Sequence, residues 1–336
     1  MTIIKKVINS PKSVATEALE GLSLAYHGKV VLLEQYASLI KSDIPDGKVT
    51  LLVGGGSGHE PLFAGFVGEN LADGAVCGNV FAAPSPDKIL GATEAINRGK
   101  GVLYLYGNYA GDNMNFDIAA ELAAEMNIPT KTVRIWDDVA SAPPEGIDQR
   151  RGIAGDLFVI KIAGAAASFV DNLDELYRIA SKARDFTRSL GVALAPGSIP
   201  ETGEFTFKLG PDEIEIGMGL HGEQGVTRQK LIPADDLVDI MIERILMDLP
   251  FYSKDRVCLL INNLGATTMM ELLIVNRRVR EVLEKQNIEI HDTLIGSYCT
   301  SQEMAGFSIS LLKLDDELQK YYDMPADSFA LTKRKA

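Results

Sequence analysis

A buried strand that runs directly into a cluster of glycines is the feature that most restricts the fold of this chain. Residues 48–53 read KVTLLV, and residues 54–60 read GGGSGHE. An apolar run of this length that ends at glycine is typical of a strand inside an α/β sheet. Because glycine has no side chain, a loop built from it lets another group approach the backbone closely. We therefore expect a ligand-binding loop after this strand, followed by a helix over residues 60–71.

The order of the following segments predicts the fold class. Strand-like runs recur at residues 75–81, 101–108 and 130–136, and helical patterns separate the later runs. This alternation predicts an α/β protein with parallel or mixed sheets flanked by helices. Ligands of such proteins bind in loops beyond the carboxyl ends of the strands. Both the glycine loop and the motif NYAGD, at residues 108–112, lie in such loops.

The second half of the chain repeats the same kinds of segment. Two long helical patterns, at residues 153–168 and 173–190, precede it. The run VCLLINNLGAT at residues 257–267 is a second strand that enters a glycine loop. We therefore predict two α/β domains, residues 1–184 with the Gly-rich loop and residues 185–336 with the second set of strands.

Charge and composition argue against some classes of function. The 336 residues carry a formal net charge of −13. This charge argues against a broad surface for nucleic acid or anionic membrane, but it is compatible with a partner protein that binds DNA. Cys77, Cys258 and Cys299 show no metal-ligand spacing and are odd in number, which is typical of free thiols in a reducing compartment. The N-terminal segment lacks the apolar core of a signal peptide and no run spans a membrane, so we predict a cytoplasmic protein.

The glycine loop does not match the common cofactor-binding motifs. A Walker A loop requires a lysine after its last glycine, and none follows here. The third position of a GxGxxG fingerprint falls on His59. The nucleophile elbow GxSxG also fails. We therefore expect no cofactor.

The four histidines fall into two groups. His27 and His291 are isolated in the sequence, and we assign them surface or structural roles. His59 and His221 each lie beside glycines at the end of a strand, in GGSGHEP and GMGLHGEQG. A histidine in such a loop is placed to face a cleft rather than to fill a core. We therefore expect a functional role for both, such as metal binding.

Acidic residues near these histidines leave two kinds of site open. Glu60 or Glu223 would complete a metal site, but no HxH or HExxH spacing supports one, so we predict none. Asp112 would complete a His–Asp constellation as a general base. A turn or helix N-cap is the structural alternative for Asp112.

Six blocks of sequence together resemble a known family. The blocks are GGGSGHEP, NYAGDNMNFD, RRGIAGD, MGLHGEQG, NNLGATT and GSYCTSQEMAGFSISLLKLDD. In this order, over nearly the whole chain, they look like DhaK, the dihydroxyacetone-binding subunit of phosphotransferase-system-dependent dihydroxyacetone kinases. The resemblance implies two α/β domains, a homodimer, and a histidine that binds the ketone covalently.

The resemblance also implies roles for individual residues. His221, in the domain 185–336, matches the histidine that forms a hemiaminal with the ketone carbon. His59 and Asp112 match residues that bind the ligand hydroxyls, and in the kinases this aspartate matches the base for the hydroxyl that takes the phosphoryl group. Gly55 and Gly56 are expected to bring backbone groups against the small triose.

The chain departs from the usual kinase pattern at three positions. Ala83 stands where a serine hydroxyl meets the ligand, Gly107 replaces a lysine at the pocket, and Gln224 replaces a proline after the covalent histidine. The first two changes remove polar groups while the histidines and the aspartate remain. They leave ligand binding intact and weaken the case for phosphoryl transfer.

Three functions follow from the resemblance. The first is a DhaQ-like sensor, which binds dihydroxyacetone on the same histidine and acts as transcription co-activator of a TetR-type (DhaS-like) regulator of dihydroxyacetone kinase genes in glycerol metabolism. The second is the glycerone kinase subunit itself, which presents the ketose to a nucleotide-binding DhaL-type subunit. The third is a kinase subunit for a similar short ketose such as erythrulose. We expect no direct contact with nucleic acid or membrane in any of them.

Overall fold

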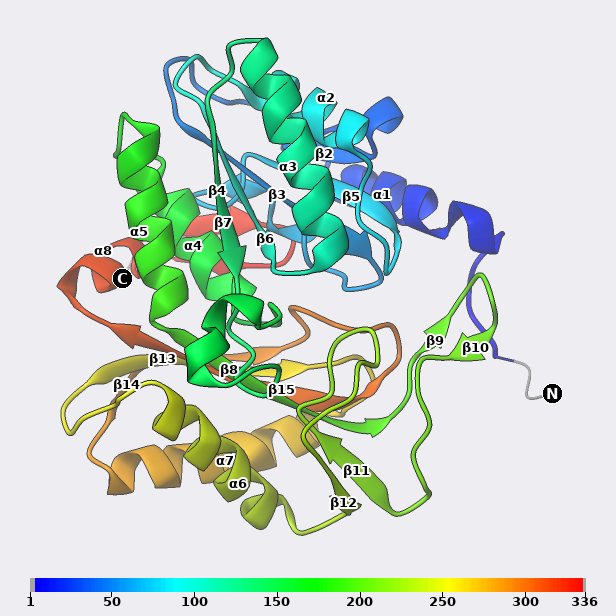
Figure 1. Ribbon diagram of the computed structural model, residues 1–336, viewed down its shortest axis with the longest axis vertical. Coiled ribbons are helices and arrows are strands. Elements are labelled where there is room, and N and C mark those ends of the chain that lie inside the picture. The colour runs from blue at the N-terminus through cyan, green and yellow to red at the C-terminus, as the bar shows by residue number, and fades with distance from the viewer. Residues whose placement is uncertain (1–3, 335–336) are drawn as a thin grey trace. The chain divides into compact units, whose positions relative to one another are not determined.

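The computed structural model describes residues 4–334 and divides the chain into two compact units (Figure 1). The glycine-strand unit comprises residues 5–135, 157–183 and the chain from residue 318 onward. The His221 unit comprises residues 136–156 and 184–317, together with Ile4. Residues 1–3, at the start of the segment considered for a signal peptide, lie outside the description.

The two units exchange segments, whereas we predicted two consecutive domains that meet near residue 185. Ser189 donates its N–H to the Asp137 carbonyl at 2.7 Å, which ties residues 136–156 to the His221 unit. Near the C-terminus, β16 (Ala326–Ser328) pairs antiparallel with β4 (Gly68–Glu69). Sequence patterns alone do not reveal these exchanges, because each depends on a contact between segments that are distant in the chain.

The glycine-strand unit contains a six-stranded sheet in the order β1-β2-β5-β3-β6-β7. β3 runs parallel to both β5 and β6, and β6 runs parallel to β7. The pairs β1–β2 and β2–β5 are antiparallel, so the predicted mixed sheet is confirmed. Parallel strands end at the same edge of a sheet, which is where ligands of α/β proteins bind. The strands are β1 Val30–Leu33, β2 Ser38–Lys41, β3 Thr50–Ser57, β5 Gly74–Val80, β6 Val102–Gly107 and β7 Thr130–Ile135.

Helices and a second, three-stranded sheet (β17-β16-β4) complete this unit. Phe116 of α3 stacks on Tyr106 with 4.3 Å between ring centroids and meets Tyr104 edge-on at 5.3 Å. All three rings are fully buried, so they fix α3 on β6. Among the residues that the structure describes, no helix is both long and apolar enough to cross a bilayer. The elements are α1 Val14–Ala25, α2 Pro86–Ile96, α3 Ala110–Glu125, α4 Asp156–Ala166, α5 Leu173–Asp185, α8 Asp316–Tyr322, β17 Thr332–Lys333 and the short helices η1 Pro11–Ser13, η2 Glu34–Tyr36 and η3 Ala64–Phe66.

The His221 unit is built on a second six-stranded sheet, in the order β12-β11-β8-β15-β13-β14. β13 and β14 are parallel and the other pairs are antiparallel. Aliphatic side chains of α6 and α7 pack on this sheet and form the buried core of the unit. The elements are η4 Pro144–Gln149, β8 Thr187–Ala195, β9 Ser198–Ile199, β10 Glu204–Phe205, β11 Glu213–Ile216, β12 Thr227–Lys230, α6 Ala234–Asp248, β13 Arg256–Asn263, α7 Met269–Lys285, β14 Glu289–Gly296 and β15 Ala305–Leu314.

Two local predictions differ from the structure. The helix expected over residues 60–71 is wrong, because only the single turn η3 forms there before β4. The helical pattern at residues 173–190 was too long, since α5 ends at Asp185 and β8 begins at Thr187. In both places a strand that pairs with distant residues overrides the local pattern.

Candidate functional site

The glycines after the first predicted strand are part of that strand. Gly54, Gly55 and Gly56 lie within β3, and the ladder to β5 includes Gly54 and Gly55 before its register shifts between Gly55 and Ser57. A Cβ on Gly55 would lie 2.4 Å from the Phe63 ring, and one on Gly56 would lie 2.8 Å from the Ala82 nitrogen. Distances this short do not occur for real Cβ atoms, so the chain's own packing requires glycine at both positions. Contact between a ligand and Gly55 or Gly56 stays a prediction.

His59 lies in a packed environment rather than in an open loop. Its side chain and backbone are only 4% exposed, and its ring lies 5.1 Å from the Phe81 ring. Gly58, which precedes it, has a φ of +101°, and a Cβ there would lie 2.8 Å from the Phe81 ring. Phe81 therefore packs over both residues. The sequence predicted that His59 faces a cleft, whereas within this unit the residue is buried.

Asp112 lies in the first turn of α3, where an acidic side chain interacts favourably with the helix dipole. The N-cap of α3 is Tyr109, so Asp112 is not the N-cap residue that we considered as its structural alternative. Two side chains in the first two turns of α3 hold the neighbouring loops. Asn113 donates to the Asn108 side chain and Asn115 donates to the Pro84 carbonyl, each at 2.8 Å. The start of α3 is thus a fixed platform that carries a partly exposed carboxylate.

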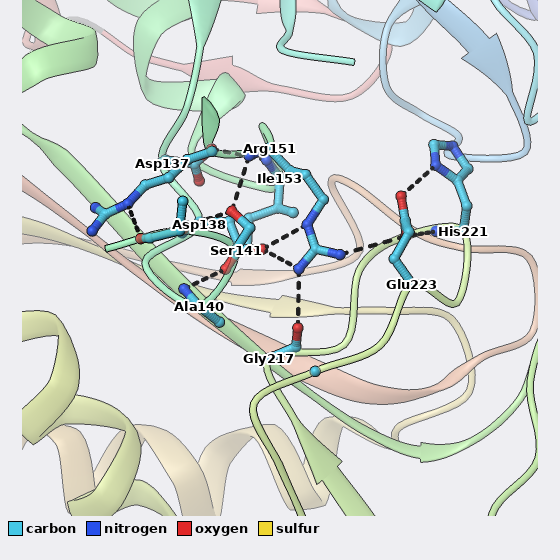
Figure 2. Close-up of polar contacts among 12 residues, drawn as sticks. Asp137, Asp138, Ala140, Ser141, Arg151, Ile153, Gly217, His221 and Glu223 are labelled. Atoms are coloured by element: carbon cyan, nitrogen blue, oxygen red, sulfur yellow. Dashed lines mark hydrogen bonds and ion pairs between the residues drawn. The ribbon is translucent and has the colours of Figure 1, made fainter. Parts of the chain in front are cut away.

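His221 is held by the carboxylate of Glu223 at two points (Figure 2). Its ring Nδ1 lies 3.2 Å from Glu223 Oε1, and its backbone N–H donates to Glu223 Oε2 at 2.9 Å. An ionised carboxylate only accepts hydrogen bonds, so the neutral ring carries its proton on Nδ1 and its lone pair on Nε2. The side chain is 27% exposed, which leaves part of the ring accessible to solvent.

The surroundings of Glu223 favour its ionised form. Burial works against the charge, but the hydrogen bond from His221 and the electrostatic interactions with His221 and Arg151 lower the pKa of Glu223 to about 2. Arg151 Nη1 lies 3.8 Å from Glu223 Oε2. At neutral pH the carboxylate is therefore a permanent hydrogen-bond acceptor for the His221 ring.

The glycines around His221 serve this contact. Gly219 donates its N–H to the Glu223 carbonyl at 3.0 Å, and Gly222 has a φ of +86°, which favours glycine. A Cβ on Gly219 would lie 2.2 Å from Glu223 Oε2 and 2.4 Å from Arg151 Nη1. Glycine at 219 therefore leaves room for the carboxylate and the guanidinium beside His221.

The second glycine loop, NNLGATT, satisfies its own polar groups. The Asn263 side-chain oxygen accepts the N–H groups of Gly265 and Thr267 at 2.9 and 3.0 Å. Thr267 in turn donates its hydroxyl to the Gly306 carbonyl at 2.7 Å. This loop braces the sheet of the His221 unit.

Two residues of this unit escaped the sequence reasoning. Ser301 is buried and donates its hydroxyl to the Leu220 carbonyl, directly before His221. Arg151 approaches Glu223 as described above. Both lie in blocks that carried the family resemblance, RRGIAGD and GSYCTSQ, and that was the available signal.

The candidate residues are divided between the units. His59 and Asp112 belong to the glycine-strand unit, and His221 belongs to the His221 unit. His27 is exposed and His291 is half-buried on the edge strand β14. Within residues 4–334, no group of three or more His, Cys, Asp or Glu side chains is placed to hold a metal ion.

Comparisons with known proteins identify the family. Residues 20–330 match the Dak1 domain. The chain belongs to the DhaK family. It is 42% identical to the dihydroxyacetone-binding subunit DhaK of PTS-dependent dihydroxyacetone kinase 2 from Listeria innocua, over 97% of this chain and 98% of that protein.

Solved structures agree with this DhaK-family assignment. The native dihydroxyacetone kinase of C. freundii has a TM-score of 0.90 and 30% identity, over 98% of this chain but only 60% of that chain. The dihydroxyacetone kinase operon co-activator Dha-DhaQ has a TM-score of 0.88 and 29% identity, over 94% of this chain and 98% of that chain. The family therefore contains both a kinase and a co-activator with this fold.

Two departures from the DhaK kinase pattern lie close to Asp112. A Cβ on Gly111, the residue before Asp112, would lie 3.5 Å from the Ala83 Cβ. Gly107 is buried at the end of β6, three residues before α3 begins. The start of α3 thus lacks both the hydroxyl of a serine at 83 and the ammonium of a lysine at 107.

Proposed function

We propose that this protein binds dihydroxyacetone, or a similar short ketose, covalently as a hemiaminal on His221. The single observation that carries the proposal is the contact of 3.2 Å between His221 Nδ1 and Glu223 Oε1. This contact directs the lone pair to Nε2 of a ring that is 27% exposed. A neutral imidazole nitrogen with this lone pair is a nucleophile for a ketone carbon.

The covalent step needs no group beyond the ketose, the two side chains and water. The Nε2 lone pair forms a bond to the ketone carbon, and the carbonyl π pair moves to oxygen, which takes up a proton. The substituted ring is then a cation whose charge the Glu223 carboxylate offsets at Nδ1. Loss of the Nδ1 proton to water completes a neutral adduct. Glycerol has no carbonyl and is excluded by this chemistry.

The other candidate residues enter the proposal as hydrogen-bonding groups. His59 and Asp112 would bind the ligand hydroxyls, and backbone groups near Gly55 and Gly56 would contact the triose. This part rests on the family resemblance, which matches all four residues. Asp112 supports it further, since its partly exposed carboxylate lies in the first turn of α3.

For the role of the bound ketose, we propose ligand sensing as a co-activator of a TetR-type regulator of dihydroxyacetone kinase genes. The start of α3 supports it, because Ala83 and Gly107 provide no polar side chain beside Asp112. The net charge of −13 suits a protein that contacts the regulator rather than DNA. A complex with the regulator that forms only with dihydroxyacetone would be observed by native mass spectrometry.

The second candidate role is the substrate-binding subunit of a phosphotransferase-dependent kinase, for dihydroxyacetone or for erythrulose. The 42% identity to a DhaK kinase subunit over nearly the full length of both chains favours it. A DhaL-type subunit would then supply the nucleotide. The sensor role predicts instead that phosphoryl transfer is at least about tenfold slower than in a DhaK kinase subunit, since Ala83 and Gly107 remove two polar contacts. Equal turnover with the family's phosphoryl-donor subunits would assign the kinase role instead.

A homodimer and a cytoplasmic location complete the proposal. The family resemblance supports the dimer, which sedimentation velocity would measure. Cys77, Cys258 and Cys299 are buried and form no disulfide, as in proteins of a reducing compartment. Burial raises the pKa of Cys77 to about 12, so its thiol is protected from oxidation.

The covalent bond is tested by NMR with [2-¹³C]dihydroxyacetone and protein labelled with ¹⁵N in its histidines. The expected result is a one-bond ¹³C–¹⁵N coupling in the wild-type complex, because the labelled carbon becomes attached to Nε2. Binding by calorimetry without any such coupling would refute the hemiaminal while leaving ketose binding intact.

A further inference from the structure

The backbone of Arg151 is fixed on both sides by one loop. Asp138 donates its N–H to the Arg151 carbonyl at 3.1 Å. Arg151 donates its own N–H to the Ser141 hydroxyl at 3.0 Å, and that hydroxyl donates to the Asp138 carbonyl at 2.9 Å. These bonds set the point from which the Arg151 side chain leaves the chain (Figure 2).

The guanidinium of Arg151 is also held in one orientation. Its Nε and Nη2 donate to Asp138 Oδ2 at 3.2 and 2.8 Å, and Nη2 also donates to the Gly217 carbonyl at 3.1 Å. With these two nitrogens engaged, Nη1 faces Glu223 Oε2 at 3.8 Å. The side chain of Arg151 is 14% exposed and that of Asp138 is 1% exposed, so solvent screens this arrangement little.

Glycines at positions 217 and 219 allow the contact between Arg151 and Glu223. Gly217 has a φ of +82°, a conformation that favours glycine, and its carbonyl accepts the Arg151 bond. Gly219 provides the space in which Arg151 Nη1 and Glu223 Oε2 approach, since a Cβ there would overlap both. Two positions of the His221 loop are thus shaped around the guanidinium.

We propose that Arg151, held by Asp138, is the positioning residue that fixes the Glu223 carboxylate and thereby the Nδ1–H tautomer of His221. The proposal deepens the covalent function above and rests on it for its biological purpose. Arg151 acts through Glu223 and is not assigned any contact with the ketose. The ion pairs from Asp138 to Arg151 and from Arg151 to Glu223 end at the nucleophile and keep its lone pair on Nε2 before ligand arrives.

A purely structural role for Arg151 predicts a different outcome. In that case, substitution would change the stability of the loop but would leave the proton of His221 on Nδ1, because Glu223 would hold it alone. The tautomer of the ring in the ligand-free protein therefore separates the two roles. It is also independent of whether a ketose binds, so failure of the covalent proposal and failure of this one are distinguishable.

The experiment is ¹⁵N NMR of the full chain labelled in its histidines, without ligand. The chain has four histidines, and His221→Gln identifies the signals of His221. We expect the wild-type ring to be protonated on Nδ1, and we expect Arg151→Met to lower the ratio of Nδ1–H to Nε2–H tautomer by roughly fivefold, the size typical of a partly exposed ion pair. Arg151→Lys should give an intermediate ratio, since it keeps the charge and loses the fork.

The matched control is Arg278→Met. Arg278 also donates through Nε and Nη2 to one aspartate, Asp239, with Nε–Oδ1 at 2.8 Å and Nη2–Oδ2 at 2.6 Å, on α6 and α7 of the same unit. Its removal should leave the His221 tautomer ratio unchanged. If Arg151→Met does not fold because Asp138 is left buried, Arg151→Met/Asp138→Asn removes both charges and carries the same expectation.

An unchanged tautomer ratio in folded Arg151→Met, or in the double variant, would overturn the proposal. An equal change in Arg278→Met would also overturn it, since the effect would then be a general loss of positive charge. A changed ratio in the Arg151 variants alone supports it, whether or not dihydroxyacetone later proves to bind His221 covalently.

Discussion

The two histidines that end glycine-rich strands carry almost the same local sequence and have different environments. In GSGHEP the glutamate follows His59 directly, and its carboxylate accepts the Gly58 N–H at 3.0 Å. In GLHGEQ one glycine separates His221 from Glu223, and that carboxylate reaches both the backbone and the ring of the histidine. With one residue more between histidine and glutamate, Glu223 contacts the imidazole of His221 as well as its backbone.

The two histidines also differ in burial, and His59 is the more buried of the two. The His59 residue is 4% exposed and lies against Phe81, whereas the His221 side chain is 27% exposed beside its carboxylate. The comparison teaches that glycine next to histidine does not by itself mark a reactive ring. We expect the Glu223 carboxylate to polarise the ring of His221 for nucleophilic attack.

The largest expected difference between the two regions is in the covalent adduct. His221→Gln should abolish the ¹³C–¹⁵N coupling, because no imidazole nitrogen remains to attack. His59→Gln should retain the coupling, with affinity lower by roughly fivefold for one lost hydrogen bond. Affinity is measured by titration calorimetry on the same samples. Loss of the coupling in both variants would remove the distinction drawn between the two histidines.

The next effect compares the two glutamates. Glu223→Gln should lower the equilibrium constant of adduct formation by about 10–100-fold, because a hydrogen bond to a charged group contributes about 1.5–3 kcal/mol. Glu60→Gln is the matched control, and it should change that constant by less than about threefold, because the Glu60 carboxylate accepts the Gly58 N–H in the glycine-strand unit. Similar losses in both variants would show that the spacing of the carboxylate is not what matters.

For the free energy of unfolding, we expect substitution of His59 to have a larger effect than substitution of His221. His59→Ala should lower the free energy of unfolding by about 1–3 kcal/mol, because it removes a buried ring packed on Phe81. His221→Ala should cost less than about 1 kcal/mol, since its ring is partly solvated. Urea denaturation without ligand measures both values. A larger cost for His221 would contradict the assignment of packing to one region and reactivity to the other.

Much of the fold followed from the sequence because it depends on local patterns. The apolar runs at β3, β6 and β7 and the helical patterns at α2 and α3 between them predicted a mixed α/β architecture. The exchange of segments between units was not predictable in this way, because it rests on pairings such as β16 with β4. Register between distant strands has no local signature in one sequence.

In the candidate site, too, the sequence identified residues that lie in motifs but not the contacts between distant segments. The motif blocks led to roles for His221, His59 and Asp112. Arg151 lies in one of these blocks but received no role, because its role depends on folding the loop of residues 137–155 against the loop of His221. The glycines illustrate the limit most directly. The sequence shows that side chains are missing at Gly55 and Gly219, but only the structure shows that Phe63 and Glu223 occupy that space.

The smallest expected effect is a difference in pH dependence between the two glutamates. The pKa of Glu223 is lowered from 4.5 to about 2, with burial opposing the shift and His221 and Arg151 causing it. The pKa of Glu60 is raised, because burial of the carboxylate outweighs its backbone hydrogen bonds, although part of the side chain reaches solvent.

These opposite shifts predict opposite slopes. Between pH 4.5 and about 2 the unfolded chain binds more protons at Glu223 than the native protein, so the stabilisation by Glu223 is present above pH 4.5 and is lost on acidification through this window. At Glu60 the native protein binds the proton more tightly, so its contribution is present below pH 4.5 and is lost as the pH rises through the raised pKa. Urea denaturation of wild type, Glu223→Gln and Glu60→Gln at several acidic pH values measures both contributions as differences in the free energy of unfolding. The difference between wild type and Glu223→Gln should decrease as the pH falls, and the difference between wild type and Glu60→Gln should increase. Parallel changes in the two differences would mean that both carboxylates experience the same surroundings, which their different hydrogen-bond partners argue against.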